Sequence, residues 1–426
     1  MTPILPSTSK SSLTIKSASF FLLAGLLVYP FSIAGSNLFF GLLLITTSLF
    51  HRHIIKQGWD KCWSEYKPIT IGILLLIGFN IIGSLWSGDF LDTDLALHKA
   101  GKQLNWILIP IIVGLVAFNP EVRLKAFVSF SIGMFLHLIV CTLQFFQVIH
   151  ISGQGSGIGD ATGFIGHLSF GFLYGIWAGL LLVVSTNLPK KWAYVCYALS
   201  LYAVIMVFLA QGRSGYITTL TCLSLVFLKV WFPQQWKIKL FIFGLLIIAL
   251  AVFIQMHNPI KTEINNTIVG VSSFLDGDWK NAEIRLKIWA VSLEIWKEHP
   301  YFGVGTSGYA DAARSMLASG KVDYLEINPA VASVFYGHPH QEFLFALSRW
   351  GPLGLLALLF LCWHWFRTGW VKDWQHDNIN AFLLTAGALS VVLHGLTEPS
   401  LNVQTATVFA IITLAFGLSP QKENET

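Results

Sequence analysis

The sequence predicts an all-α protein that crosses a membrane about twelve times. Hydrophobic residues make up 54% of the 426 residues and charged residues only 12%, whereas a soluble globular domain carries about 25% charged residues. Roughly twelve apolar stretches approach the length of about 20 residues that a helix needs to cross the hydrocarbon layer. Because lipid offers no hydrogen-bond partner to an open backbone group, each stretch is expected to be a helix.

The expected spans follow one another along most of the chain. They cover residues 17–34, 35–50, 69–86, 105–118, 126–147, 163–186, 192–210, 214–232, 239–256, 343–366, 379–395 and 401–418. Residues 1–256 therefore hold the first nine spans, 257–342 form one long connection, and 343–426 hold the last three spans and a tail. No small-residue cleavage site follows the first apolar run, so this run is expected to be an anchor. The five cysteines have no paired spacing in the long connection, which speaks against a disulfide framework or a thiolate zinc site.

The distribution of cations predicts the orientation of the chain. Lysine and arginine collect in short loops on the cytoplasmic side. If the N-terminus lies inside, the inner segments hold 16 cations and the short outer loops hold three, Lys99, Lys102 and Arg213. We therefore expect both termini in the cytoplasm. The long connection, and any chemistry it performs, is then expected on the outer face.

The long connection contains a predicted helix followed by a glycine-rich turn. Residues 281–300, "NAEIRLKIWAVSLEIWKEHP", read as a helix that Pro300 stops. Arg285, Trp289, Ser292 and Trp296 share one face of it, because they follow at helical spacing. This helix either rests on the membrane interface through its aromatic residues or directs Arg285 toward an anionic lipid head. The turn "YFGVGTSGY" then leads into a second short helix.

Several polar side chains fall at the outer border of the spans, where burial costs free energy. Arg213 lies between two spans and either extends its charge to the aqueous edge or serves a functional site. His338 and His340 precede the tenth span, although a lone histidine is more often structural than catalytic. Glu398 lies between the last two spans and either pairs with a cation or belongs to a site. His167 lies near the outer end of its own span.

The sequence offers little for a metal ion. His338 and His340 could form a His-x-His pair, but no third ligand is apparent nearby. Two Asp-x-Asp strings, Asp92–Asp94 and Asp276–Asp278, fall in outer segments. Paired carboxylates can hold a cation, but a solvated loop is the simpler interpretation. We therefore expect neither a metal nor another cofactor.

The stretch "YGHPHQEFLFALSRWGPLG" contains a spaced motif: His340, then Gln341, nine residues, Gly351, two residues and Gly354. Together with "RLKIWAVSLEIWKEHPYFGVGTSGY", "QGRSGY" and "HGLTEPSLN", it resembles the bacterial O-antigen ligases and their relatives, the O-antigen polymerases and protein O-oligosaccharyltransferases. The first segment is similar to the family's histidine pattern. The others are similar to its Arg-x-x-x-Trp helix with a Gly-x-Gly turn, its short arginine segment and its late acidic-Pro segment. The two glycines are expected to let the tenth helix begin and pack closely.

One position departs from the family pattern. Relatives often carry an acid two residues before the first glycine, where this chain has Arg349. If that acid orients the histidine in relatives, its role is absent here or is taken by Glu342 or Glu398. Glu398 itself stands where an aspartate is commoner in the family.

The resemblance implies a GT-C-like membrane glycosyltransferase of the bacterial inner membrane, with its active site facing the periplasm. It would move a polysaccharide from undecaprenyl diphosphate to a sugar hydroxyl of lipid A-core, without a metal and with inversion. Apart from membrane lipids, donor and acceptor are the implied partners, and no nucleic acid is expected.

The resemblance also implies roles for individual residues. His340 would be the general base, with His338 as the fallback, because a shift of two residues exchanges them. Arg213 and Arg285 would bind the diphosphate. The supporting residues would be Glu398, Trp289, His167 and Arg349.

Three other functions stay open at this point. An O-antigen polymerase uses the same kind of donor and a second lipid-linked glycan as the acceptor, and a protein oligosaccharyltransferase is the next alternative. A lipid or glycan transporter also fits twelve spans, but transporters often carry charged residues near the bilayer centre. Here the unusual polar residues gather at one face, which favours chemistry over transport.

Overall fold

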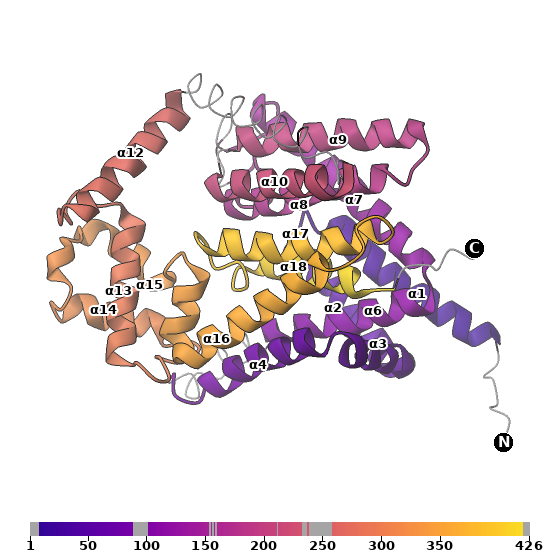
Figure 1. The fold of residues 1–426 in the computed structure, drawn as a ribbon, viewed down its shortest axis with the longest axis horizontal. Coiled ribbons are helices and arrows are strands. Elements are labelled where there is room, and N and C mark those ends of the chain that lie inside the picture. Colours follow the sequence, from indigo (N-terminus) through magenta and orange to yellow (C-terminus); the bar gives the residue numbers. More distant parts are fainter. Residues whose placement is uncertain are drawn as a thin grey trace.

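The structure, a computed structural model, describes residues 8–87, 101–152, 155, 157, 160–210, 212–231, 237 and 258–420, and all regular structure among them is helical (Figure 1). The first half contains α1 (Thr8–Val28), α2 (Ile33–Phe50), α3 (Arg52–Glu65), α4 (Lys67–Gly83), η2 (Leu104–Ile107), α6 (Leu108–Phe118), α7 (Glu121–Phe145), α8 (His167–Ser185), α9 (Lys190–Leu209), α10 (Arg213–Leu225) and the π-helical η3 (Val226–Trp231). The second half contains α12 (Asn258–Leu275), α13 (Ile284–Glu298), α14 (Tyr309–Ala318), η4 (Asp323–Leu325), η5 (Pro329–Val331), α15 (Val334–Gly337), α16 (Glu342–Trp370), α17 (Asn378–Gly395) and α18 (Gln404–Leu418).

Each predicted span that falls within the described residues coincides with a helix, and the ninth, 239–256, lies outside them. In the described part of the chain, eight helices are long and apolar enough to cross a membrane, or nine if α3 and α4 count as one bent span. Residues 16–28 of α1 and all of α18 are shorter apolar helices. The predicted class, an all-helical polytopic membrane protein, is confirmed, whereas the number of twelve spans stays a prediction.

Helix α3 lies in a segment that the sequence predicts to be only a connection between the second and third spans. It bends by 111° against α4 and carries Arg52, Lys56 and Lys61, which would be costly in hydrocarbon. Its buried face, which includes Ile54 and Cys62, packs against α6. The segment therefore folds back on the bundle and does not extend the span.

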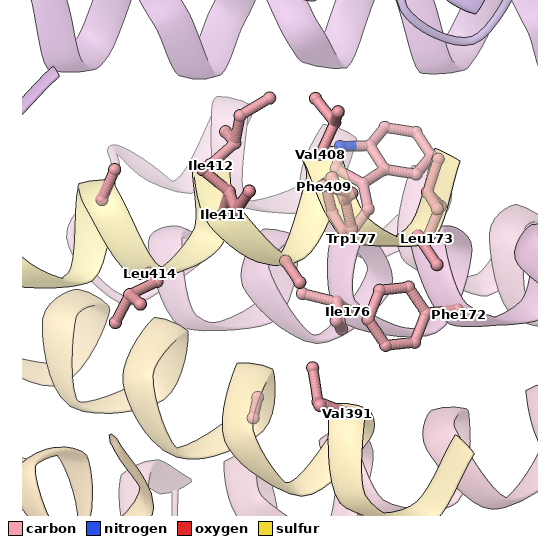
Figure 2. Packing of buried hydrophobic residues seen from close by; sticks show 14 of the residues in the cluster. Phe172, Leu173, Ile176, Trp177, Val391, Val408, Phe409, Ile411, Ile412 and Leu414 are labelled. Carbon is pink, nitrogen blue, oxygen red and sulfur yellow. The ribbon is translucent and has the colours of Figure 1, made fainter. Parts of the chain in front are cut away.

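The centre of the bundle is formed by α8, α17 and α18, whose residues are mostly buried. Figure 2 shows this packing, in which Phe172 and Trp177 of α8, Val391 of α17 and Phe409 of α18 belong to one apolar cluster. Aromatic side chains of this size contribute a large share of the buried area of a core. These three helices form the frame that holds the turn between α17 and α18.

The helices of the long connection have a small core of their own and lie together at one end of the molecule (Figure 1). The predicted helix 281–300 is α13, which ends one residue before the His299-Pro300 pair. Its buried residues, Ile288, Val291 and Ile295, pack with α14 and with Phe345 of α16. On the face predicted from the spacing, Ser292 is buried and bonds the hydroxyl of Tyr309 at 2.7 Å.

The helices of the long connection, which we call the small domain, contact the bundle at a kink in α16. Gly351 has φ +68° and ψ −168° inside the helix, and Pro352 follows. Because a proline has no N–H, the carbonyl of Ser348 loses its helical partner; the N–H of Val304 donates to it instead at 2.9 Å. The N–H of Gly305 donates to the carbonyl of Arg349 at 2.8 Å. The glycine-rich turn thus satisfies the backbone groups that the kink exposes.

The motif glycine Gly351 lies at the break between two helical stretches of α16. The first stretch begins at Glu342, and the second begins at Pro352, directly after Gly351. An added Cβ at Gly351 would lie 2.1 Å from the carbonyl oxygen of Tyr301. The position requires glycine because of its positive φ and because the turn approaches so closely.

Replacing Gly351 by alanine is expected to destabilise the protein. Left-handed backbone costs an alanine about 1–2 kcal/mol, and the contact with Tyr301 adds to this cost. The thermal unfolding midpoint of purified Gly351→Ala should fall clearly below that of the wild type. The matched control is Gly78→Ala in α4, where no atom lies within 4 Å of an added Cβ, and its midpoint should not fall. Equal midpoints for Gly351→Ala and the wild type would contradict the proposed constraint.

Candidate active site

Three segments meet at the end of the bundle that faces the small domain. They are the residues before α16, the turn between α17 and α18, and the first turn of α13. The turn is held by His394, which bonds the hydroxyl of Ser400 at 2.7 Å and the carbonyl of Leu168 at 2.9 Å. Since Leu168 lies in the first turn of α8, the turn is tied to the central frame.

His340 and Glu398 form a hydrogen-bonded pair at the centre of this site. The Nδ1 of His340 lies 2.9 Å from Oε1 and 3.1 Å from Oε2 of Glu398. The Glu398 side chain is 2% exposed and that of His340 is 25% exposed. An ionised carboxylate can only accept, so Nδ1 carries the proton and Nε2 keeps its lone pair. A carboxylate in this position fixes the tautomer and orientation of the ring and stabilises the imidazolium that forms when Nε2 takes a proton.

His338 lies beside His340 in a different chemical state. The rings lie 4.3 Å apart, and the backbone N–H of His340 donates to Nδ1 of His338 at 3.2 Å. The pKa of His338 is lowered to about 4, first by burial and second by the neighbouring His340, against the opposing effect of Glu398. A neutral His338 with Nδ1 occupied carries its proton on Nε2, and it has no free lone pair. The geometry therefore distinguishes two histidines that the sequence leaves interchangeable.

Arg285 brings a cation to the same carboxylate. Its Nη2 lies 3.6 Å from Oε1 of Glu398, and its side chain is 30% exposed. The carboxylate of Glu283 accepts from the N–H of Arg285 at 2.6 Å and caps the start of α13. One guanidinium edge thus faces Glu398, and the group still has donors for a second anion.

The sequence from residue 198 to residue 359 matches the family model of the O-antigen ligases. This part of the chain is therefore similar to the O-antigen ligase and polymerase superfamily. The matched region contains α10, α13 and the kinked half of α16, and it ends before Glu398. Members of the superfamily are glycosyltransferase-like enzymes that act on lipid-linked glycans. No curated protein matches the chain.

The superfamily pattern around His340 has a structural explanation. The side-chain oxygen of Gln341 accepts from the N–H of Leu344 and caps α16. Asn and Ser, which the pattern also allows at this position, are the residues that cap helices best. His340 itself has φ +50°, a strained value for a residue with a Cβ, and such strain tends to cluster at functional sites.

Arg349, which the superfamily pattern leaves unexplained, is a buried connector. Its Nη1 donates to Oδ1 of Asn402 at 2.7 Å and its Nη2 donates to Oδ1 of Asn80 at 3.3 Å. Its guanidinium lies over the rings of Phe345 and Trp350, at 4.6 Å and 4.4 Å from their centroids. Arg349 thus ties α4 and α16 to the segment after Glu398.

Glu342 supports the same segment. Its carboxylate accepts from the N–H of Leu401 at 2.7 Å and from the side-chain amide of Asn402 at 2.8 Å. Of the two acids considered as partners of His340, Glu398 contacts it, whereas Glu342 holds the turn that carries Glu398. Neither Asn402 nor Asn80 belongs to the candidate residues that the sequence predicts. The only available signal for Asn402 is its place in the late acidic-Pro segment.

The remaining candidate residues are Arg213, His167 and Trp289. Arg213 is the first residue of α10; its side chain lies outside the described part of the structure. His167 is the exposed first residue of α8, and an added Cβ at Gly212 would lie 3.2 Å from its carbonyl oxygen. The start of α10 therefore lies beside the start of α8. Trp289 is half-buried, and its indole N–H has no hydrogen-bond partner among the described residues.

The structure supplies the third metal-ligand candidate that the sequence does not reveal. One atom each of His338, His340 and Glu398 lie within 4.8 Å of one another. However, the His340 Nδ1 is at hydrogen-bonding distance from both carboxylate oxygens, and Arg285 faces one of them. A cation would have to displace the first contact and lie beside the second charge, so the donor set fits a hydrogen-bonded site better. Asp278 is exposed and bonds Asn281 at 2.8 Å, and Asp92–Asp94 lie outside the described residues.

The lowered pKa of His338 predicts how the stability of the folded protein depends on pH. In the unfolded chain a histidine binds a proton below a pH of about 6.5, whereas folded His338 binds one only near pH 4. Its contribution to stability is therefore lost as the pH falls from about 6.5 toward 4. The unfolding midpoint should drop less between pH 7.5 and pH 5 in His338→Gln, whose amide oxygen can still accept from His340. The same drop in variant and wild type would show that His338 titrates normally.

Proposed function

We propose that the protein is an O-antigen ligase, which transfers O-antigen polysaccharide from undecaprenyl diphosphate to a sugar hydroxyl of lipid A-core. The observation that carries the proposal is the His340–Glu398 pair with Arg285 beside it, within a chain similar to this superfamily. The pair offers a base and the arginine offers a fixed positive charge. A glycosyl transfer from a diphosphate to an alcohol needs both.

The base acts on the acceptor. An alcohol is a poor nucleophile, so its proton must leave as the new bond forms, and a neutral histidine suits this task near pH 7. Nε2 of His340 takes the proton while the acceptor oxygen attacks the anomeric carbon. Glu398 stabilises the resulting imidazolium. Direct attack from the side opposite the diphosphate inverts the anomeric centre.

The arginines act on the leaving group. When the bond from the anomeric carbon to the diphosphate oxygen breaks, undecaprenyl diphosphate departs with additional negative charge. Guanidinium groups match phosphate oxygens in a bidentate geometry and keep their charge. Arg285 is placed to do this, and Arg213 is the second proposed ligand. In this mechanism no metal is required, because fixed cations supply the electrostatic stabilisation.

The membrane arrangement fits a substrate with a lipid tail and a soluble glycan. We propose twelve spans, both termini in the cytoplasm of an inner-membrane protein, and residues 257–342 on the periplasmic side in a GT-C-like architecture. The diphosphate would then lie at the outer head-group level, beside the small domain. The polar residues of the site are all at this one end, which favours an enzyme over a transporter.

The first test is transfer by purified protein from undecaprenyl-diphosphate glycan to lipid A-core. His340→Ala should lower the rate by about 10²-fold or more, because a general base contributes about 10²–10⁴-fold. His338→Ala is the matched control. It removes one neutral hydrogen bond of about 1 kcal/mol, so its rate should fall only about fivefold.

Two outcomes would contradict the mechanism. Equal rates for His340→Ala and the wild type would remove His340 from the chemistry. A rate that chelator abolishes and added divalent cation restores would replace the proposed arginine mechanism by one that uses a metal at His338, His340 and Glu398.

A deletion strain separates the ligase from its relatives. Without the ligase, cells should accumulate lipid-linked polymer and carry bare core, because polymer forms but is not attached. If the core carries single repeat units instead, the protein is a polymerase. If the core carries normal polymer and a protein loses its glycan, the protein is an oligosaccharyltransferase. Analysis of lipopolysaccharide and lipid-linked intermediates from the same cells reads all three outcomes.

A further inference from the structure

We propose that the protein binds an anionic phospholipid at the end of the bundle opposite the candidate active site. Arg123 would hold the headgroup phosphate, and an acyl chain would fill the apolar cavity beside it. This site is separate from the proposed transferase site and does not depend on the transferase activity.

The cavity lies between α1, α7, α8, α17 and α18 and has a volume of about 560 Å³. Its walls are mainly apolar and include Leu26, Phe130, Ile176, Trp177, Phe409 and Ile412. Figure 2 shows the last four in the packed layer of α8 and α18. This volume lies within the usual range for a small-molecule site, about 300–1,000 Å³, and the lining matches a hydrocarbon chain.

The cavity has a polar end, and this end is far from His340 along the helices. It is lined there by Arg123 in the first turn of α7, Asn187 after α8, Asn378 at the start of α17 and Pro420 after α18. The candidate active site uses the start of α8, the end of α17 and the turn before α18. For each of these three helices the cavity therefore opens at the opposite end.

Among the described residues, no acid forms an ion pair with Arg123 at this polar end. Its Nη2 donates to Oδ1 of Asn380, but its buried Nη1 has no hydrogen-bond partner among the described residues. The acids of the neighbouring loop have cations of their own: Oδ2 of Asp377 lies 2.9 Å from Lys372, and Asp373 lies 2.7 Å from His376. Oδ1 of Asp377 is buried without a hydrogen-bond partner among the described residues, but it lies beyond ion-pair distance from Arg123. Among the described residues, no carboxylate oxygen lies within 4.0 Å of a nitrogen of the Arg123 guanidinium.

A half-buried charge whose buried Nη1 has no hydrogen-bond partner among the described residues is costly, and an anion that reaches Nη1 would lower this cost. A phosphate suits the planar guanidinium, and the adjacent cavity can take the chain that is attached to it. Basic pockets between transmembrane helices bind anionic lipid headgroups in this way. Charge and shape together point to a phospholipid with a net negative headgroup. In the proposed orientation, it comes from the cytoplasmic leaflet.

The test uses delipidated full-length protein in a neutral detergent, with phosphatidylglycerol and phosphatidylcholine of equal chain length as probes. Native mass spectrometry measures binding, and thermal unfolding measures stabilisation. The wild type should bind phosphatidylglycerol about tenfold more tightly than phosphatidylcholine, since a hydrogen bond between charged groups changes the affinity by about a factor of ten. Phosphatidylglycerol should also raise the unfolding midpoint in a saturable way. Equal affinity for the two lipids would overturn the proposal without any variant.

Variants then locate the site. Arg123→Gln should lose the roughly tenfold preference, and Arg123→Lys should keep part of it. The matched control is Lys125→Gln: Lys125 is exposed on the same helix and pairs with Glu121. If Lys125→Gln loses the preference as fully as Arg123→Gln, general surface charge explains the binding and the site at Arg123 is wrong. A full preference in Arg123→Gln also overturns the proposal.

Discussion

The rest of the structure depends on how the kink in α16 is satisfied. Backbone groups at a membrane border must find partners within the protein, and Pro352 and Gly351 leave the carbonyls of Ser348 and Arg349 without their helical donors. The N–H groups of Val304 and Gly305 supply the missing bonds. Because the turn that donates them directly follows α13, the same two bonds fix the small domain against the bundle. This contact brings Arg285 to a carboxylate that belongs to another part of the chain.

Glu398 contacts polar side chains from both the bundle and the small domain. Its carboxylate accepts from the ring of His340 and faces the guanidinium of Arg285. In this arrangement one negative charge balances one positive charge, while His338 stays neutral. A diphosphate that approaches Arg285 would compete with Glu398 for this cation. Such competition would leave the carboxylate to the ring of His340.

The sequence predicts the helices well because their apolar length is a local property. It also brings His340, Arg285 and Glu398 forward as candidates, because each is a polar residue where a span should begin or end. It does not reveal that Glu398 contacts His340 across 58 residues, or that Arg349 reaches Asn80 across 269. It also leaves His338 and His340 interchangeable. The contact of His340 with Glu398 and the backbone contact between the two histidines together decide which ring keeps a free lone pair.

Buried Arg349 and half-buried Arg123 show how the surroundings, and not the residue type, separate a structural role from a binding role. Arg349 donates to two asparagines from different elements and lies over two aromatic rings, so its charge is stabilised within the protein. Arg123 contacts one asparagine and lines an apolar cavity. The first completes a network and holds a turn in place, whereas the second still has hydrogen-bonding capacity that a ligand can use.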